Sequence, residues 1–417
     1  MFKAPLRDLQ FALDVAGLPG LAAQAFPEAD ASTVTAVLEG AAQVAEEVLA
    51  PLNRIGDRCG ASFADGKVTA APGFAAAYKT YAEGGWTSLA SPPAHGGQGL
   101  PKAVSLAAFE MTHAANMAFG LCPMLTEAAV EALVEHGTQQ QQALYLPRLV
   151  SGEWTGCMNL TEPQAGSDLS LVRTLAEPDG EGGYRLHGTK IYITWGDHDA
   201  ADNIVHLVLA RLPDAHPGVK GISLFLRSPF LVSAEGAIGE RNAITVGGIE
   251  HKLGIHASPT CTLIFEGAKA ELVGRPNEGL AHMFTMMNAA RLNVGVQGVG
   301  IGERAYQQAV LYAKERRQGR SPWSPDATAP IADLPDVRRM LMLMKAKIEA
   351  ARMICLSAAV AADTAKTSGD EVAKLREDFL IPIAKAWSTD VGCEVASLGV
   401  QVHGGMGFIE ETGAAQH

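Results

Sequence analysis

The stretch NLTEPQAGSD, Asn159–Asp168, stands where the pattern of the sequence changes. Hydroxyl and carboxylate side chains alternate there with residues of little bulk, so hydrogen-bonding groups lie along a backbone that other groups can approach closely. One interpretation is a turn, in which Pro163 fixes φ and Ser167 or Asp168 caps the residues that follow. The other is a loop against which a flat, polar ligand lies. These ten residues alone do not decide between the two.

Before this stretch, hydrophobic residues recur at helical spacing. From Ser32 to Pro51 the spacing predicts an amphipathic helix that ends at Pro51. The same period predicts further helices over residues 74–81, 106–119, 127–136 and 139–150. Residues 1–153 are therefore predicted to form an N-terminal all-α domain.

After this stretch, short segments rich in β-branched residues alternate with Gly, Pro and Asp turns. They predict strands over residues 184–194, 204–212, 222–226 and 260–265. Such segments build a middle β domain over residues 154–275, a barrel or a sandwich, and the pattern does not choose between those two architectures.

Long helical patterns then return. They cover residues 283–317, 337–364 and 371–398. Pro382 is expected to interrupt the third pattern, and the three together predict a C-terminal helical bundle over residues 276–417. The predicted fold class is therefore α+β, with an N-terminal helical domain, a middle β-barrel or sandwich domain and a C-terminal helical bundle.

Charge and composition exclude several classes of protein. The formal net charge of −12 argues against nucleic acid as a partner, because phosphate binding needs a surplus of Lys and Arg. Neither a signal peptide nor an apolar run long enough for a membrane span is evident, so the protein is expected to be cytoplasmic. The 6 cysteines lie far apart and the histidines lack ligand spacing, so no disulfide frame and no metal is predicted.

Three further segments carry groups that could bind a ligand. In KIYITWGDHD, Lys190–Asp199, a strand would place Tyr192 and Thr194 on one face, where a flat heteroaromatic ring could stack; an ordinary half-buried strand explains the pattern equally well. The arginines of YAKERRQGR, Tyr312–Arg320, suit a pyrophosphate, although basic residues also favour helix C-termini. The glycines of QVHGGMGFIEETG, Gln401–Gly413, let a phosphate or sugar approach the backbone.

In this order, and on this layout, the segments resemble the acyl-CoA dehydrogenase family of flavoproteins. The family pattern T-E-P-x-A-G-S-D is complete at Thr161–Asp168, and its aromatic-x-Thr strand stands at Tyr192–Thr194. HKLGIHASPTCTLIF, residues 251–265, is similar to a late signature of the β domain. QVHGGMGFIEETGAAQH, residues 401–417, is most similar to the longer bacterial type that includes the 3-methylmercaptopropionyl-CoA dehydrogenases. The resemblance covers nearly the whole chain.

The resemblance implies FAD as cofactor and assigns roles to residues. It implies the FAD-binding residues Leu160, Thr161, Tyr192, Thr194, Arg316, Gln318, Gln401, Gly404 and Gly405, and the substrate-binding residues Ser167 and Arg291. The loop at Thr161 would run along the isoalloxazine ring, Tyr192 would pack on that ring and Thr194 would bond near N5. The segment at Gln401 would reach into a neighbouring subunit, which requires a homodimer or homotetramer. For Arg291 a structural salt bridge is the alternative role.

The implied reaction is α,β-dehydrogenation of an acyl-CoA thioester to a trans-2-enoyl-CoA, with hydride transfer to flavin N5. Because the α-proton of a thioester is only weakly acidic, its removal needs a well-placed carboxylate. Electrons would then pass to an electron-transferring flavoprotein. An acyl-CoA oxidase is an alternative that uses the same cofactor.

The catalytic base is the point where the resemblance fails. Most members carry it in a Tyr-Glu-Gly-Thr loop soon after the Gly-Gly segment, and residues up to His417 contain no such loop. A second known placement corresponds to Ala290, and Glu410 and Glu411 fit neither pattern. We therefore expect no base within the chain, a base Glu beyond His417 and a helical bundle that is incomplete at its C-terminal end. A base-less relative that binds acyl-CoA without oxidising it is the alternative.

Overall fold

The computed structural model describes residues 2–321, 323 and 328–417. Its contacts divide the chain into two compact units, each described by itself below. The helical unit comprises residues 1–54, 100–117 and 291–417, and the barrel unit comprises residues 55–99 and 118–290. The domain boundaries at residues 153 and 275 follow the order of the chain instead, and they stay a prediction.

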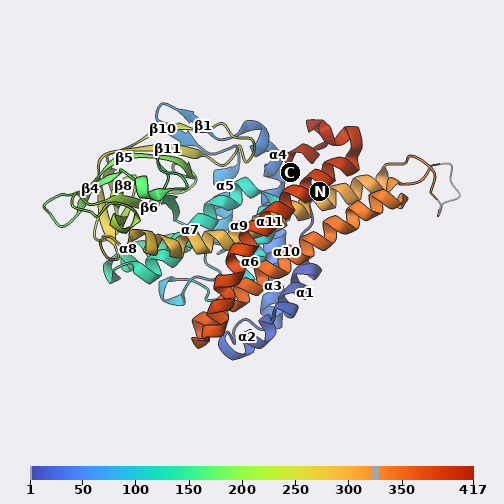
Figure 1. The fold of residues 1–417 in the computed structure, drawn as a ribbon, viewed down its shortest axis with the longest axis horizontal. Helices are drawn as coiled ribbons and strands as arrows, with labels where there is room; N and C mark the ends of the chain where they lie inside the picture. Colours follow the sequence, from blue (N-terminus) through green and yellow to red (C-terminus); the bar gives the residue numbers. More distant parts are fainter. Residues whose placement is uncertain (1, 322, 324–327) are drawn as a thin grey trace. The chain divides into compact units, whose positions relative to one another are not determined.

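The helical unit is built from eight helices, of which α4 and α9 continue into the barrel unit. They are α1 (Leu6–Ala16), α2 (Leu18–Ala25), α3 (Ala31–Val44), α4 (Ala50–Cys59), α6 (Lys102–Ala115), α9 (Gly279–Glu315), α10 (Pro335–Ser368) and α11 (Glu371–His403). Figure 1 shows α9, α10 and α11 as the long ribbons coloured from yellow-orange to red. The three long helices predicted from the sequence are thus confirmed, and the loop over residues 321–330 between two of them lies partly outside the described residues.

Two prolines do not act as the sequence predicted. Pro382 lies inside α11, which continues to His403. Its side chain is exposed, so its ring meets solvent and the helix loses one backbone hydrogen bond without breaking. Pro51 does not end the first helical segment either. The backbone stays helical from α3 through a turn of π-helix, Ala45–Leu49, into α4, and the shifted hydrogen bonds of that turn accommodate the proline that follows it.

The long helices approach one another closely where glycines face each other. A Cβ added at Gly298 of α9 would lie 2.1 Å from the carbonyl oxygen of Ser388 in α11. A Cβ added at Gly392 of α11 would lie 2.8 Å from the carbonyl oxygen of Gly298. Any side chain at either position would therefore push the two backbones apart.

A buried ion-pair network joins α6, α9 and α10. The guanidinium of Arg352, which is fully buried, donates to Glu110 at 2.7 Å and to Glu303 at 3.1 Å. It also donates to Glu349 at 2.6 Å. Burial raises the pKa of Glu110, although the charge of Arg352 opposes that rise. Lys345 also pairs with Glu303 and Glu349, so removing Arg352 would leave the buried Glu110 without its cation.

The barrel unit contains the strands and three helices. These are β1 (Ser62–Ala64), β2 (Lys67–Thr69), α5 (Phe74–Glu83), α7 (Met117–His136), α8 (Gln139–Ser151), β3 (Trp154–Asn159), β4 (Leu175–Pro178), β5 (Tyr184–Thr194), β6 (Asn203–Arg211), β7 (Ile222–Arg227), β8 (Phe230–Val232), β9 (Ile238–Arg241), β10 (Ile244–Ile249) and β11 (Thr260–Val273). The predicted α+β fold class is confirmed, with helices before and after a β-rich middle (Figure 1).

The main sheet closes into a barrel. Its strands pair in the order β11, β5, β4, β6 and β7, and β7 pairs with β11 again, which closes the ring. Outside the ring, β3 pairs only with β6 and β10 only with β11. The interior is filled by buried apolar side chains such as Leu186, Val208 and Phe225. The sequence left barrel and sandwich open, and the closed strand order decides for the barrel.

One helix of the described residues, α7, is long and apolar enough to cross a membrane by length and composition. The expectation that the chain has no apolar run of this length was therefore wrong. Within the structure 72% of its most apolar window is buried. Its Phe119 lies 6.1 Å from Phe74 and 5.5 Å from Tyr81, measured between ring centroids, so the apolar character of α7 is accounted for by packing in a core.

Replacing Arg352 by Met is expected to lower the free energy of unfolding by about 3–5 kcal/mol, because the buried carboxylate of Glu110 loses its cation. The loss should be smaller at about pH 5 than at about pH 8, because protonation then neutralises Glu110, whose pKa burial already raises. Urea unfolding followed by circular dichroism measures both effects.

The control is Arg339→Met, which removes only an exposed contact with Asp336 on the same helix. It should cost less than about 1 kcal/mol. An Arg352→Met protein as stable as this control would show that the buried network does not hold the helices together.

Candidate functional site

The stretch Asn159–Asp168 does form a tight turn. Glu162 and Ala165 exchange backbone hydrogen bonds, each with an N···O distance of 3.0 Å. Asp168 accepts a hydrogen bond from the backbone N–H of Ser170 at 2.9 Å and caps the short helical turn that follows. Ser167 is exposed between these two features. The turn interpretation is correct, and it leaves one edge of the loop open.

A buried ion pair fixes this turn to β5. The ammonium of Lys190 donates to a carboxylate oxygen of Glu162 at 2.8 Å and to the carbonyl oxygen of Leu160 at 2.9 Å. Both charged side chains are at most 3% exposed. The hydroxyl of Thr174 donates to the same carboxylate at 2.6 Å, and two backbone N–H groups donate to it as well. The loop is therefore held by hydrogen bonds on both carboxylate oxygens.

The burial and the contacts of the ion pair shift the pKa values of both partners. Burial opposes ionisation of Glu162, but the charge of Lys190 and the hydrogen bonds outweigh it and hold the pKa of Glu162 below its ordinary value. Burial lowers the pKa of Lys190 to about 8, against the charge of Glu162. Both groups are thus charged at neutral pH, and the pair is a genuine buried ion pair.

The same loop is joined to the strand that carries the second predicted segment. The backbone N–H of Ile191 donates to the carbonyl oxygen of Thr161 at 2.9 Å. Thr161 and Thr194 are half-buried, and neither hydroxyl forms a hydrogen bond within the part of the chain that the structure describes. The structure therefore brings Leu160, Thr161 and the strand end at Thr194 into one rigid piece with two hydroxyls available to a ligand.

Strand β5 bulges where it meets this loop. Lys190 pairs with Leu263 and Ile193 with Cys261, so two residues of β5 stand opposite one residue of β11. The second of them, Tyr192, has φ of 60° and a side chain that is 60% exposed, whereas Ile193 is buried. Such a backbone conformation costs a non-glycine residue energy and recurs at ligand sites. The bulge presents the ring of Tyr192 outward beside Thr194.

In the helical unit, a ring stack brings two other predicted segments together. Tyr312 of α9 stacks on His403 of α11, with ring centroids 4.4 Å apart and an angle of 27° between the planes. One turn after Tyr312, the exposed Arg316 donates to the side-chain oxygen of Gln318 at 2.9 Å. The end of α9 and the end of α11 therefore lie side by side.

The glycines at the end of α11 leave open space beside the backbone. Gly404 ends the helix with φ of 61°, and its N–H donates to the carbonyl oxygen of Gln401. A Cβ added at Gly404 or Gly405 would meet no atom within 4 Å in the described part of the chain. Gln401 is exposed at this end of α11. A phosphate or sugar could therefore approach this backbone, as the sequence suggested.

The remaining predicted positions offer no buried acid. Arg291 is half-buried in α9 and has an interaction partner within the protein. Ala290, which takes the place of one family base, is buried. Glu410 and Glu411 are exposed in a short helical turn. Among the described residues no group of His, Cys, Asp or Glu is arranged to hold a metal ion.

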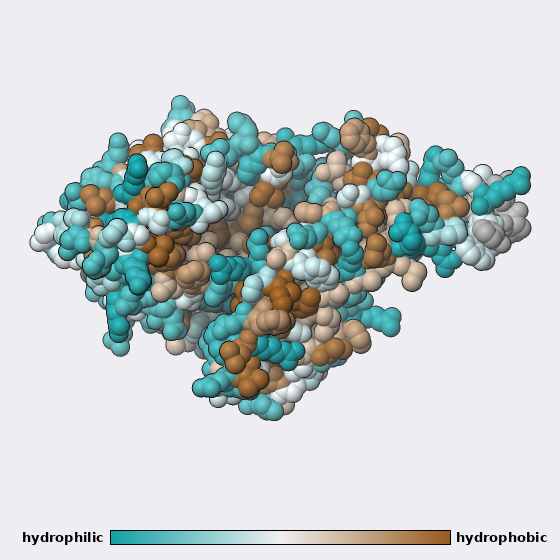
Figure 2. All heavy atoms as spheres, in the orientation of Figure 1, coloured by the Kyte–Doolittle hydropathy of each residue, from teal (hydrophilic) through white to brown (hydrophobic). Residues whose placement is uncertain are grey.

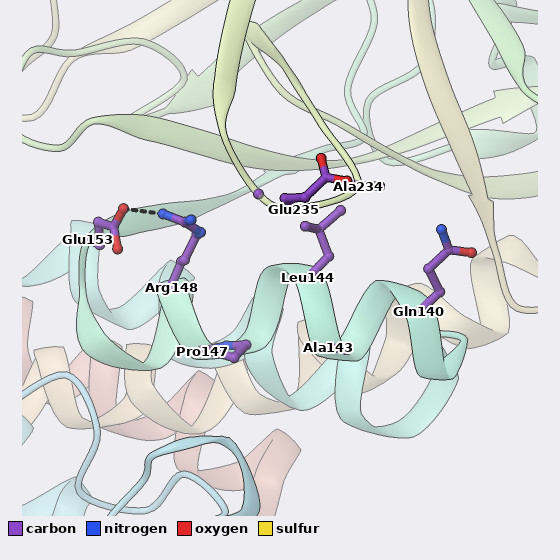
Figure 3. Close-up of a pocket in the computed structure, with 9 residues that line it drawn as sticks. Gln140, Ala143, Leu144, Pro147, Arg148, Glu153, Ala234 and Glu235 are labelled. Carbon is purple, nitrogen blue, oxygen red and sulfur yellow. Dashed lines mark hydrogen bonds and ion pairs between the residues drawn. The ribbon is translucent and has the colours of Figure 1, made fainter.

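A surface cavity of about 470 Å³ lies elsewhere in the barrel unit (Figure 3). It is bounded by α8 below and by the turn at Ala234 and Glu235 above, and Arg148 points across its floor to pair with Glu153. None of the residues predicted to bind FAD or substrate lines it. We therefore place the candidate site at the Thr161 loop and not in this cavity.

The sequence was compared with protein families and with known proteins. Residues 33–153, 157–268 and 277–417 match the family models described as the N-terminal, middle and C-terminal domains of acyl-CoA dehydrogenase. The chain belongs to the acyl-CoA dehydrogenase family, whose members are flavin-dependent oxidoreductases.

Named relatives place it within that family. It is 47% identical over 421 residues to 3-methylmercaptopropionyl-CoA dehydrogenase of Ruegeria pomeroyi, covering 100% of this chain and 72% of that protein. It is 36% identical to a butyryl-CoA dehydrogenase of Syntrophomonas wolfei, covering 88% of this chain and 63% of that protein. The solved structure of butyryl-CoA dehydrogenase from Megasphaera elsdenii matches with a TM-score of 0.76 at 27% identity, over 92% of this chain and 91% of that one.

Replacing Lys190 by Met is expected to destabilise the barrel unit by about 3–5 kcal/mol, because Glu162 stays buried without its cation. It should also speed hydrogen exchange at the amide of Ile191, whose acceptor is the carbonyl of the loosened Thr161. Urea unfolding and amide exchange followed by mass spectrometry measure these effects.

Lys269→Met, which removes an exposed lysine from β11, is the matched control and should change stability by less than about 0.5 kcal/mol. Unchanged exchange at Ile191 in the Lys190 variant would mean that the ion pair does not hold the loop.

Proposed function

We propose that this chain binds FAD and an acyl-CoA thioester and takes part in α,β-dehydrogenation to a trans-2-enoyl-CoA. The observation that carries the proposal is the pair of unbonded hydroxyls of Thr161 and Thr194, held on two segments that the Lys190 ion pair and the Ile191 hydrogen bond fix together. A preorganised row of hydroxyl and backbone groups suits the polar edge of an isoalloxazine ring.

The residues of the barrel unit would orient the ring. The backbone at Leu160 and the hydroxyl of Thr161 would bond the pyrimidine edge, the exposed ring of Tyr192 would pack on the flavin and the hydroxyl of Thr194 would bond near N5. When bound, FAD supplies the acceptor for the β-hydrogen of the substrate. The exposed Ser167 would face the pantetheine arm of the thioester.

Residues of the helical unit are proposed to contact the pyrophosphate of FAD. Arg316 carries a delocalised charge that pairs well with a pyrophosphate, and its hydrogen bond to Gln318 orients it. The open backbone at Gly404 and Gly405, with Gln401, would receive a phosphate or ribose group of a second cofactor molecule. Arg291 is proposed as a CoA contact.

The base that removes the α-proton is proposed to be a Glu beyond His417. Electron-transferring flavoprotein is proposed as the electron acceptor and the cytoplasm as the compartment. The relatives named above act on short acyl-CoA thioesters by their names, so 3-methylmercaptopropionyl-CoA and butyryl-CoA are the first substrates to test.

Purified protein supplied with FAD is expected to be yellow, and dithionite should bleach it. Because the base is proposed to lie outside residues 1–417, anaerobic acyl-CoA should bleach the protein translated from the complete gene but not the 417-residue chain. Flavin absorbance under anaerobic conditions measures this. Bleaching of the 417-residue chain would place the base inside it, and two unbleached proteins that bind acyl-CoA would indicate a base-less relative.

Replacing Thr194 by Val should weaken FAD binding by about fivefold to tenfold, because the isosteric change removes one hydrogen bond to the flavin. Equilibrium dialysis against FAD measures the affinity. Thr189→Val, on the same strand, is the matched control and should bind FAD as the unmodified chain does. Equal affinity in both variants would place the flavin elsewhere.

A self-association surface supports the proposed homo-oligomer. Along α11, Val372, Leu375 and Phe379 are 73%, 68% and 68% exposed, at helical spacing on the side opposite the buried residues. Figure 2 shows hydrophobic side chains gathered over this helix. An exposed apolar stripe of this kind marks an interaction surface, and a second copy of the chain would bury it.

Replacing Phe379 by Asp is expected to shift the protein toward monomer by at least about tenfold in the association constant, because a charge would be buried in the interface. Sedimentation velocity over a range of concentrations measures it. Lys385→Asp changes an exposed residue of α11 outside the stripe and should leave assembly unchanged. A monomeric unmodified protein, or an unaffected Phe379 variant, would contradict the proposal.

A further inference from the structure

Three neighbouring strands of the barrel unit carry a polar row into the interior. Cys157 of β3 pairs with His206 of β6, and His206 pairs with Arg227 of β7. Directly paired residues on adjacent strands project to the same face of a sheet, so the three side chains lie in one row. All three are at most 2% exposed. An arginine in such a row is unusual, because a buried cation normally has a carboxylate partner.

Arg227 has no such partner. Its three guanidinium nitrogens form no hydrogen bond with any described residue. The guanidinium lies over the ring of Phe265, with its Cζ 4.8 Å from the ring centroid. Burial lowers the pKa of Arg227 to about 9, so the side chain stays charged at neutral pH. The interior of the barrel therefore holds a positive charge that has a ring face beside it and no hydrogen-bonded partner among the described residues.

The groups around Arg227 do not cancel this charge. Burial lowers the pKa of His206 far below neutrality and raises the pKa of the Cys157 thiol, so both are neutral. The carboxylate of Asp197 favours the charged form of Arg227, but it forms no hydrogen bond with that guanidinium among the described residues. Burial raises the pKa of Asp197, and the cation that opposes that rise most is Arg241.

Strand pairing and one hydrogen bond connect Arg227 to the strand end at Thr194. The thiol of Cys157 donates to the carbonyl oxygen of Thr194 at 3.4 Å. The side chains of Cys157 and Arg227 also influence each other's pKa. Since adjacent strands are about 4.8 Å apart, Arg227 is two strand spacings from β3, or about 10 Å. Cys157 and His206 thus lie between the strand end at Thr194 and the buried cation.

We propose that Arg227 raises the reduction potential of the flavin bound at Thr161 and Thr194, acting as a fixed charge in the interior of the barrel. This rests on the proposed function. Accepting a hydride adds one proton and two electrons to the flavin, so its charge becomes more negative by one. Two strand spacings separate Arg227 from β3, and the flavin would lie beyond Thr194, so the cation would be roughly 10–15 Å away. At that distance and an effective dielectric constant of about 20, it favours the reduced state by about tenfold. Arg227 is a tuning residue and contacts no substrate.

The test is a spectroelectrochemical titration of the FAD-loaded protein against a reference dye. Arg227→Met should lower the equilibrium constant for flavin reduction by about tenfold, which is about 30 mV for two electrons. Arg227→Lys keeps the charge and should stay within about threefold of the unmodified protein. Arg185→Met removes an exposed arginine from β5 and should leave the potential unchanged. Sulfite, which adds to flavin as an anion, should bind the Met variant more weakly.

The outcomes separate this inference from the proposed function. An unmodified protein that takes up no FAD overturns the proposed function and the inference together. An unmodified protein and an Arg227→Met variant that both bind FAD with the same potential overturn the inference alone. Arg227→Gln, a second neutral variant that retains polar donors, gives the same comparison if the Met variant does not fold.

Discussion

The arrangement of the candidate site depends on one buried ion pair, between Lys190 of β5 and Glu162 of the loop after β3. Charges of opposite sign that are both removed from water must find each other and fill their remaining hydrogen-bonding positions, or the fold is destabilised. Here they do so with backbone groups of the loop itself. The same contacts that stabilise the barrel unit therefore set the positions of Thr161 and Thr194, and stability and site geometry share one cause.

Much of the fold followed from hydrophobic period alone. The helical pattern over residues 337–364 corresponds to α10, and the β-branched pattern over 184–194 corresponds to β5. The effects of Pro51 and Pro382 were misjudged because a long, packed helix can lose one backbone hydrogen bond, or shift to a π-helical turn, and still continue. Closure of the barrel could not be predicted either, since pairing of β7 with β11 joins segments whose contact no local pattern encodes.

The residues of the candidate site were likewise predicted only in part. The quoted motifs identified Thr161, Tyr192 and Thr194 because hydroxyls, aromatic rings and small residues gather there in sequence. Lys190 and Glu162 were both inside those motifs, yet their pairing was missed, because opposite charges 28 positions apart carry no spacing signal. Arg227 was missed for a stronger reason. It is the last residue of β7 and is followed by Ser228, a position where an arginine is ordinarily exposed, so only the three-strand row reveals its burial.

The position of β3 at the edge of the sheet affects which parts of this protein can tolerate substitution. β3 is bonded to a single neighbour, so the backbone ladder constrains the chain entering the loop on one side only. On its other side β3 is held in place by side-chain contacts. Single substitutions can change those contacts while the closed ring of strands stays intact. Substitutions among related proteins can therefore change the side chains of the cofactor site without changing the barrel fold.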